Sequence, residues 1–290
     1  MFSKDRETNQ VDKSTERKAM DSAGSPSKES EGVTVVLPVK NVSAILTPCL
    51  ESLRWAHEVL LVDGQSTDGT LEIAARFPNV RSIQHPSKDI RVIVQESQGL
   101  ARHPWIFWFC ADEVCTPELG EEILARIHTA PSEVTHFMVP SKCHLFGTDF
   151  GNGETFPRLW RKGSARFPLK RMHEMPDLIG KSENLTHVYW HVDNPNIRTI
   201  IPKFLRYEYV DAQAASDADC ERINPSFFYQ LARFNYYAIR MYWPHRKRGV
   251  GGTLMGLTAG MGQLIRHLLL VEEGRIRRGE TIRDTHGWGS

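Results

Sequence analysis

Two apolar segments of this chain each lead to carboxylates, and these carboxylates are the side chains best suited to chemistry. Residues 59–62 run into Asp63, and residues 105–109 are followed closely by Asp112 and Glu113. A carboxylate at the end of a buried strand is costly to bury unless a partner pairs with it. The N–H groups of a nucleotide base or a divalent metal ion would provide that partner.

The elements that must position these carboxylates are strands of one sheet. Segments that are apolar on both faces are typical of central strands in a mostly parallel sheet covered by helices. Ligands of such sheets bind beyond the carboxyl ends of the strands. We therefore expect Asp63 and Asp112 to lie at the same edge of the sheet and to face one cleft.

Strand and helix patterns alternate through the first half of the chain, which predicts an α/β fold with right-handed crossovers. The expected strands cover residues 33–37, 59–62, 80–83, 105–109 and 135–139, and the expected helices cover 46–53, 71–77, 91–101 and 117–127. Residues 146–171 are rich in Gly, Pro, Arg and aromatic residues, which predicts a loop-heavy region with short strands at 158–160 and 187–190. Helical patterns return from residue 197.

The segment after Asp63 has the composition of a ligand-binding turn. Ser66 or Thr67 can cap the following helix, whose unpaired N–H groups and positive dipole end would then point into the cleft. Gly64 permits a tight turn and a close approach of the backbone to a ligand. The alternative is a plain strand–turn–helix in which Asp63 or Asp68 is only a helix cap.

Two further groups of residues could take part in the same chemistry. Asp112 and Glu113 can hold a divalent ion against a diphosphate and so neutralise the charge of a leaving group. The alternative is an acidic cluster before a helix that opens at Pro117, worth well under about 1 kcal/mol. Downstream, His173 and Glu174 can serve as a phosphate partner and a general base, with a surface ion pair as the alternative.

Composition excludes several classes of function. Lys and Arg number 36 against 35 Asp and Glu, a net charge of +1, so the chain has no overall basic field for nucleic acid. The 5 cysteines are scattered without a Cys-x-x-Cys pair, which indicates neither a disulfide framework nor a zinc knuckle and favours a reducing cytosol. Residues 1–31 are polar and lack the apolar core of a signal peptide, so we expect a disordered tail on a cytoplasmic protein.

Two helices are expected near the C-terminus, at residues 226–243 and 252–271, around the basic residues 245–248. The first is rich in aromatic residues and the second in Gly and Leu. Such a pair can lie in a bilayer interface, which would place the protein peripherally on the inner face of the plasma membrane. A hairpin packed on the core is the alternative. No stretch reaches the ~18 uninterrupted apolar residues of a spanning helix.

Taken together, these motifs resemble family 2 glycosyltransferases of the GT-A fold, in particular the bacterial branch that adds sugars to lipopolysaccharide core or similar lipid-linked acceptors. The resemblance covers about residues 33–271. Its most specific motifs are VDGQSTDGT at residues 62–70 and Ala111-Asp112-Glu113, at the place of the family's metal-binding Asp-x-Asp. Further matches in family order lie at residues 35–41, 49–56, 158–163, His173, Glu174, His187 and 246–252.

The resemblance implies a role for each matching residue. Pro38 and Asp63 would flank the base of a nucleotide-sugar donor, and Asp112 would hold Mg or Mn on its diphosphate. Glu174 would be the catalytic base that deprotonates an acceptor hydroxyl for single displacement with inversion. By residue type alone, the arginines near residue 158 could equally form a solvated face. The implied donor-binding residues are Pro38, Asn41, Asp63, Ser66, Asp68, Arg91, Ala111, Arg158 and His173.

Cys110 departs from the family pattern, because it stands where the first Asp of Asp-x-Asp belongs. A thiol is a poor ligand for hard Mg, so metal binding would rest on Asp112, with Glu113 or a later His. The same change makes a non-catalytic, glycosyltransferase-like scaffold an alternative function. A nucleotidyltransferase is disfavoured, because residues 38–41 lack the Gly-rich loop that cradles a triphosphate in that class.

The predicted regions are a polar tail at 1–31, a GT-A-type glycosyltransferase domain at 32–215 and a helical extension at 216–290. Within the domain, residues 32–130 would bind the nucleotide sugar and residues 131–215 the acceptor. The expected partners are a nucleotide-sugar donor, a glycan or lipid-linked acceptor and a membrane surface reached through residues 226–271, and nucleic acid is not among them.

Overall fold

The central sheet of the protein is mixed and mostly parallel. The computed structural model describes residues 31–87, 89–168, 175–193 and 197–280, so nearly all of the predicted polar tail lies outside the described residues. Its strand order is β3 (Val80–Gln84), β2 (Glu58–Asp63), β1 (Val33–Val39), β4 (Trp105–Trp108), β7 (Thr148–Arg161), β6 (Val134–Leu145), β11 (Tyr189–Asp193) and β5 (Glu113–Cys115). β10 (Lys181–Asn184) pairs with β6, and β8 (Ala165–Arg166) forms a separate ribbon with β9 (Asp177–Leu178).

The four strands at one end of the sheet, β3, β2, β1 and β4, are all parallel. β7 is antiparallel to both β4 and β6, and β5 is antiparallel to β11. β1 is buried along nearly its whole length, as expected for a central strand covered on both faces. The structure therefore confirms the predicted α/β sheet.

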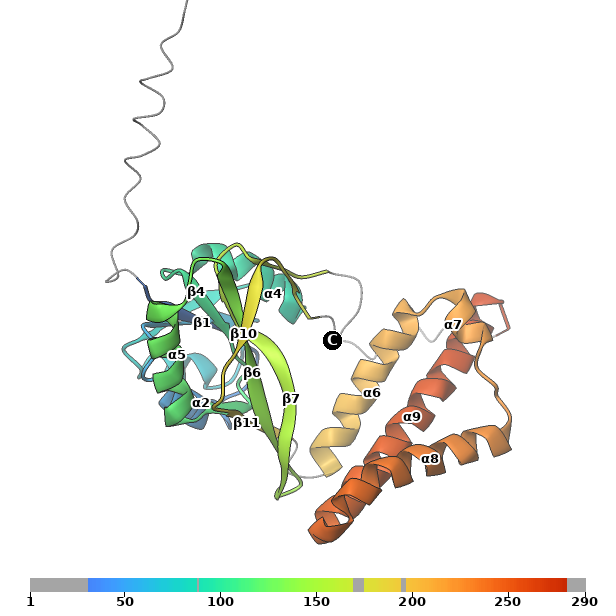
Figure 1. The fold of residues 1–290 in the computed structure, drawn as a ribbon. Helices are drawn as coiled ribbons and strands as arrows, with labels where there is room; N and C mark the ends of the chain where they lie inside the picture. Colours follow the sequence, from blue (N-terminus) through green and yellow to red (C-terminus); the bar gives the residue numbers. More distant parts are fainter. Residues whose placement is uncertain (1–30, 88, 169–174, 194–196, 281–290) are drawn as a thin grey trace, which may run out of the picture.

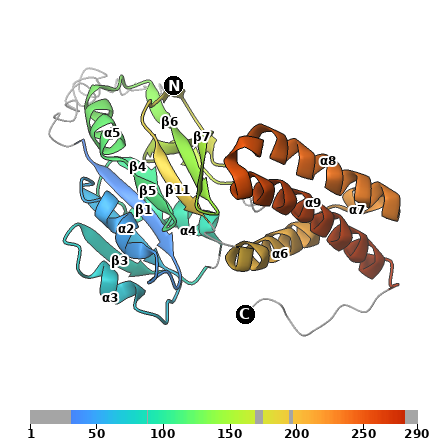
Figure 2. The ribbon, with the colours of Figure 1, turned by 90° about the horizontal axis from the view of Figure 1, so that it is seen from below.

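Helices cover both faces of this sheet (Figure 2). They pack on alternate residues of its strands. On one face α2 (Leu46–Ser52), α3 (Thr70–Ala74) and α5 (Pro117–Thr129) share a core with Val35 and Leu37. On the other face α4 (Ile90–Ser97), which continues into η2 (Gln98–Leu100), packs near Val36 and Trp160. This alternation along β1 follows from the two-residue period of a strand.

The loop-heavy prediction is wrong for residues 148–161, which form one strand of a long hairpin, whereas the short strand predicted at 158–160 is confirmed within β7. β6 and β7 run antiparallel over residues 134–161 and turn at Phe146 and Gly147, both with positive φ (52° and 70°). Glycine tolerates this conformation without strain. The register shifts of this pair break the strict alternation of apolar and polar residues on which strand prediction depends.

The C-terminal helices form a layer beside this hairpin (Figure 1). They are α6 (Ile197–Ala214), α7 (Asp217–Glu221), α8 (Phe227–His245), η3 (Arg246–Arg248) and α9 (Gly249–Arg277). α9 lies between α6 and α8, and a small core of Leu145, Phe150, Ile200 and Met255 joins this layer to the hairpin. Among the described residues, the helical stretch Phe227–Arg277 is long and apolar enough to cross a membrane by length and composition, with 28% of its most apolar window buried.

α8 approaches α9 at a stripe of glycines. A Cβ added to Gly256 would lie 2.7 Å from the carbonyl oxygen of Ala238, and one added to Gly260 would lie 2.9 Å from that of Phe234. Side chains at these positions would push the two backbones apart, because neither obstacle is a flexible side-chain end. The glycines therefore set the distance between the two helices.

Gly256→Val is expected to lower the free energy of unfolding by about 1–3 kcal/mol, because the added methyl groups overlap backbone atoms of α8. The measurement is chemical denaturation of the full chain. Gly262→Ala is the matched control, because nothing lies within 4 Å of its Cβ position, and helix propensity alone should stabilise that variant. Equal destabilisation by both variants would contradict the close approach.

Candidate active site

Asp63 is the last residue of β2 and is fully buried. Val39 of β1 lies beside it in the parallel register, and Pro38 lies beside Val62, so Pro38 and Asp63 share the carboxyl edge of the sheet. Both carboxylate oxygens of Asp63 accept from the backbone N–H of Ser66 at 3.1 Å. This bond fixes the direction in which the chain leaves the strand.

The loop after Asp63 is tied to the loop after β1 by reciprocal hydrogen bonds. The backbone N–H of Asn41 donates to Ser66 Oγ at 2.9 Å, and the Thr67 N–H donates to Asn41 Oδ1 at 2.8 Å. Asn41 has a positive φ of 52°, a conformation that Asn tolerates better than most residues. Asn41 and Ser66 therefore hold the two loops together at the predicted donor site.

Asp68 closes the same loop from its other end. Its carboxylate accepts from the Ser43 N–H at 3.1 Å, from the Thr70 N–H at 3.1 Å and from Thr70 Oγ1 at 2.5 Å. These bonds, led by that from the Thr70 hydroxyl, lower the pKa of Asp68 to about 2. Asp68 is thus ionised at neutral pH, and its carboxylate serves the loop that borders the site.

Asp112 follows β4 in a turn at the same edge of the sheet, preceded by the buried Ala111. The Val192 N–H donates to the carbonyl oxygen of Asp112 at 2.8 Å, which holds this turn against β11. Asp112 Oδ2 lies 3.4 Å from His191 Nε2 of β11 and 3.7 Å from Lys203 Nζ of α6. Burial acts to raise the pKa of Asp112, but the hydrogen bond with His191 and the charge of Lys203 lower it overall.

Asp112 and His191 fit a divalent ion. Their side chains are 27% and 36% exposed, so both can be reached, and carboxylate oxygen and imidazole nitrogen suit ions such as Mn. No group of three or more His, Cys, Asp or Glu that could hold a metal is found among the described residues. Diphosphate oxygens and water would supply the other ligands, as is usual for ions of this kind.

Glu113 and Cys110 do not join this pair. Glu113 is 2% exposed, and its carboxylate accepts from Arg158 Nη2 at 2.8 Å and from the Cys110 N–H at 2.8 Å. Cys110 packs against the apolar cluster that contains Trp108, and burial raises the pKa of its thiol. The chain therefore offers His191, and not Glu113, as the second donor beside Asp112.

Arg158 lies in β7 and is nearly buried. Besides its ion pair with Glu113, its guanidinium lies 4.6 Å from the ring centre of Trp108 and 5.4 Å from that of Tyr189. Burial raises the pKa of the Glu113 carboxyl, and the Arg158 charge opposes that shift. Arg158 thus stabilises the turn that carries Asp112 through its ion pair with Glu113, and its predicted contact with a donor stays a prediction.

Arg91, the other predicted basic contact, lies in the first turn of α4. Its guanidinium forms a bidentate ion pair with Asp89, at 3.0 Å from Nε and 2.6 Å from Nη2. Asp89 also caps the helix by accepting from the Arg91 N–H. The structure thus gives Arg91 a role in the start of α4, and its predicted contact with a donor stays a prediction.

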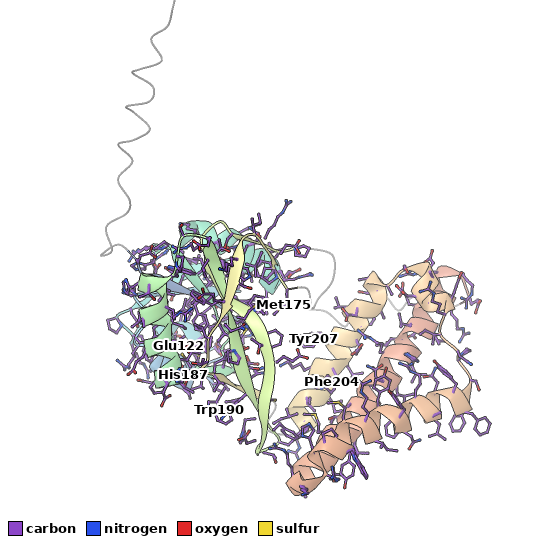
Figure 3. All side chains as sticks on the ribbon, in the orientation of Figure 1. Glu122, Met175, His187, Trp190, Phe204 and Tyr207 are labelled. Atoms are coloured by element: carbon purple, nitrogen blue, oxygen red, sulfur yellow. The ribbon has the colours of Figure 1, made fainter. Side chains whose placement is uncertain are left out.

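His173 and Glu174 lie outside the described residues, so their predicted roles are untested. The next residue, Met175, packs against the apolar cluster of Trp108 and Trp160. Figure 3 labels Met175 at the edge of the sheet domain nearest α6, and Phe204 and Tyr207 on α6. His187 pairs instead with Glu122 of α5, at 3.0 Å, in the lower left of the same view.

His191 and Lys203 are the site residues that the sequence did not single out. A later His was expected near Asp112, but residues 187–191 contain two, and motif order favoured His187. The antiparallel register of β11 with β5 places His191 opposite Glu113, next to Asp112. Lys203 had no sequence signal, since it is one of several basic residues in a helix far along the chain.

The chain is similar to known proteins mainly over its sheet domain. Residues 34–181 match the model of Glycosyl transferase family 2. The lipopolysaccharide core biosynthesis glycosyltransferase LpsC of Rhizobium meliloti is 28% identical over 143 residues, which are 46% of this chain and 53% of LpsC. A PGL/p-HBAD biosynthesis glycosyltransferase of Mycobacterium tuberculosis is 38% identical over 89 residues, 28% of this chain and 35% of that protein.

These matches span about half or less of the length of the relatives. Among solved structures, S. aureus TarS aligns with a TM-score of 0.47 and 14% identity, over 78% of this chain and 55% of that one. A truncated TarS, residues 1–349, in complex with UDP-GlcNAc aligns with a TM-score of 0.42 and 15% identity, over 87% of this chain and 93% of that one.

Proposed function

The chain belongs to glycosyl transferase family 2, whose model matches residues 34–181, and we propose that it transfers a sugar from a nucleotide-sugar donor, with inversion, to an envelope glycan or a lipid-linked acceptor. The observation that carries this proposal is the placement of Asp63 and Asp112 at one sheet edge. Because β2 and β4 flank β1, the ends of these two strands lie about 10 Å apart. A nucleoside diphosphate can bridge such a separation.

The two ends of the site would bind different parts of the donor. The buried Asp63 and the loop of Asn41 and Ser66 would receive the base and ribose. Asp112 and His191 would hold Mg or Mn, which when bound neutralises charge on the diphosphate. Lys203 brings a further positive charge to the same end.

The transfer step would be a single displacement. The acceptor hydroxyl loses its proton to the base, its oxygen forms a bond to the anomeric carbon, and the bond from that carbon to the diphosphate oxygen breaks. The nucleoside diphosphate leaves with the bonding electrons. Glu174 is the proposed base, because the resemblance of His173-Glu174 to the family motif implies that role.

The acceptor class rests on the family and on the relatives. LpsC is named for lipopolysaccharide core biosynthesis, and the mycobacterial relative for PGL/p-HBAD biosynthesis. We propose by analogy an acceptor of the cell envelope, presented on a lipid. A catalytically silent scaffold remains the competing function, because Cys110 replaces one acidic residue of the Asp-x-Asp.

Donor binding is the first test. Thermal unfolding of the full chain is followed with a panel of nucleoside diphosphates and nucleotide sugars, with and without Mn or Mg. A ligand at 100 times its dissociation constant should add about 2.7 kcal/mol to the free energy of unfolding. A shift that depends on metal supports the proposal, and Asp63→Ala should abolish that shift.

Asp177→Ala is the matched control for this test, since Asp177 is an exposed carboxylate of the β8–β9 ribbon. A shift that survives in Asp63→Ala would remove Asp63 from the donor site. No shift with any nucleotide would overturn the proposed function. Tight binding without any transfer to lipid-linked or free glycan acceptors would favour the scaffold.

Glu174→Gln is expected to lower turnover by at least about 100-fold, because the amide cannot accept the proton of the acceptor hydroxyl. Donor binding should stay at the level of the natural chain, as read by the same thermal shift. Steady-state transfer assays give the turnover, and Glu154→Gln in the β6–β7 hairpin is the control. Unchanged turnover in Glu174→Gln would assign the base to another residue.

A further inference from the structure

The outer face of α8 presents a row of large apolar side chains to the solvent. Among them are Phe228 (78% exposed), Trp243 (62%), Ile239 (59%), Tyr236 (57%) and Leu231 (46%). They recur every three to five residues and so share one side of the helix. In Figure 1, α8 is the outermost helix of the C-terminal layer, with α9 between it and α6. A contiguous row of exposed apolar side chains of this kind indicates a surface that binds a protein partner or a membrane.

The close packing of α8 on α9 explains why these side chains point outward. At Gly256 and Gly260 backbone atoms of α8 lie directly against α9, so α9 has no room for a large side chain at these two positions. In water, helix pairs usually bury their large apolar side chains against each other. Contacts through small residues are typical of helices whose other sides meet an apolar medium.

The charged residues of α8 and η3 are all basic. No Asp or Glu occurs in residues 222–271, whereas Arg233, Arg240, Arg246, Lys247 and Arg248 lie in α8 and η3. Three of these basic residues form η3, directly after the aromatic end of α8, and all three are exposed. The guanidinium of Arg246 lies 4.7 Å from the ring centre of Trp243. Aromatic and basic side chains side by side suit the headgroup level of a membrane with anionic lipids.

The opposite side of the layer, where α9 packs against α6, contains ion pairs. Arg266 of α9 pairs with Glu208 of α6 at 2.8 Å and with Asp211 at 3.0 Å. Charged groups such as these are costly inside the hydrocarbon region. The side of α9 that faces α6 therefore stays outside the hydrocarbon region. The hairpin suits a position on a membrane and not across it, although the stretch Phe227–Arg277 is long enough to span.

We propose that the α8–α9 hairpin binds the surface of a membrane that contains anionic lipids, with the outer face of α8 in the interface and η3 at the headgroups. This inference stands on the hairpin alone and goes beyond the proposed transfer reaction. Together with that reaction, membrane binding would bring the site at Asp112 to acceptors carried by the same membrane. The helical layer reaches the site through α6, whose Lys203 lies beside Asp112.

The test is flotation of the full chain with vesicles of phosphatidylcholine and phosphatidylglycerol. The natural chain should float with them and bind pure phosphatidylcholine vesicles at least about tenfold less, with binding weakened by salt. The double variant Ile239→Glu, Trp243→Glu should lose binding by at least about tenfold. Ile179→Glu is the control, because Ile179 is 75% exposed on the sheet domain.

A second pair of variants tests the charges. Arg246→Gln with Lys247→Gln should lower binding to the anionic vesicles, whereas Lys181→Gln on exposed β10 should not. Unfolding midpoints and the nucleotide shift are measured on every variant, so a failure of folding or of the donor site is seen separately. Equal flotation of the Ile239/Trp243 variant overturns the proposal. The proposal is also overturned if the natural chain does not float but self-associates, and the Ile239/Trp243 variant abolishes that self-association. In that case α8 would bind a second copy of the chain.

Discussion

Asp112→Asn is expected to lower sugar transfer by about 1,000-fold, equivalent to about 4 kcal/mol of transition-state stabilisation. The reason is electrostatic, because the carboxylate meets His191 and Lys203 at the end of the site where the leaving diphosphate would lie. An amide of the same shape keeps the turn after β4 but removes the negative charge that binds a cation. The measurement is steady-state transfer over a range of Mn concentrations.

Two histidine variants sharpen this prediction. His191→Ala should raise the Mn concentration needed for half-maximal transfer by at least about 10-fold, as expected for loss of a ligand or its support. His187→Ala is the matched control, four residues earlier, because His187 pairs with Glu122 at 3.0 Å. Both variants should keep the unfolding midpoint of the natural chain. Full activity of Asp112→Asn, or equal effects of the two histidine variants, would remove the proposed cation site.

The second large effect concerns stability. Glu113→Gln is expected to lower the free energy of unfolding by about 3–5 kcal/mol, because the buried Arg158 would lose the only carboxylate of its ion pair. The guanidinium would remain charged between Trp108 and Tyr189, which stack on it but do not neutralise it. Chemical denaturation measures the change.

A double variant shows whether the pair itself is responsible. Adding Arg158→Met to Glu113→Gln should recover most of the lost stability, because an apolar side chain replaces the unpaired charge. Glu51→Gln is the control, since its partner Arg54 is 56% exposed and solvent screens the pair. If Glu113→Gln changes stability no more than Glu51→Gln does, the buried pair is not what supports the turn under Asp112.

The family match and the mixed sheet flanked by helices confirm the predicted GT-A-type α/β fold. α6 belongs to the helical layer, because it packs against α9 through the ion pair of Arg266 with Glu208. The two C-terminal helices were also predicted close to their observed bounds, Phe227–His245 and Gly249–Arg277. Long segments with a steady apolar pattern made these predictions possible.

The sequence by itself determined the parallel direction of the first strands and the shared edge of Asp63 and Asp112. Apolar runs that end at carboxylates are local patterns, and parallel strands bring their carboxyl ends to one edge whatever the rest of the fold does. The bond from the Ser66 N–H to the Asp63 carboxylate is equally local, because the two residues are only three positions apart.

Only the tertiary structure decided which side chains surround Asp112. His191 reaches it because β11 is antiparallel to β5 in one particular register, and a shift of one residue would turn that imidazole to the other face. The pairing of Glu113 with Arg158, 45 residues away, likewise depends on neighbouring strands that no local pattern specifies. Lys203 comes from a helix docked by the tip of the β6–β7 hairpin. Contacts of this kind arise from packing between distant segments. Residue type and spacing could therefore predict which sheet edge carries the site, but not all of its charged side chains.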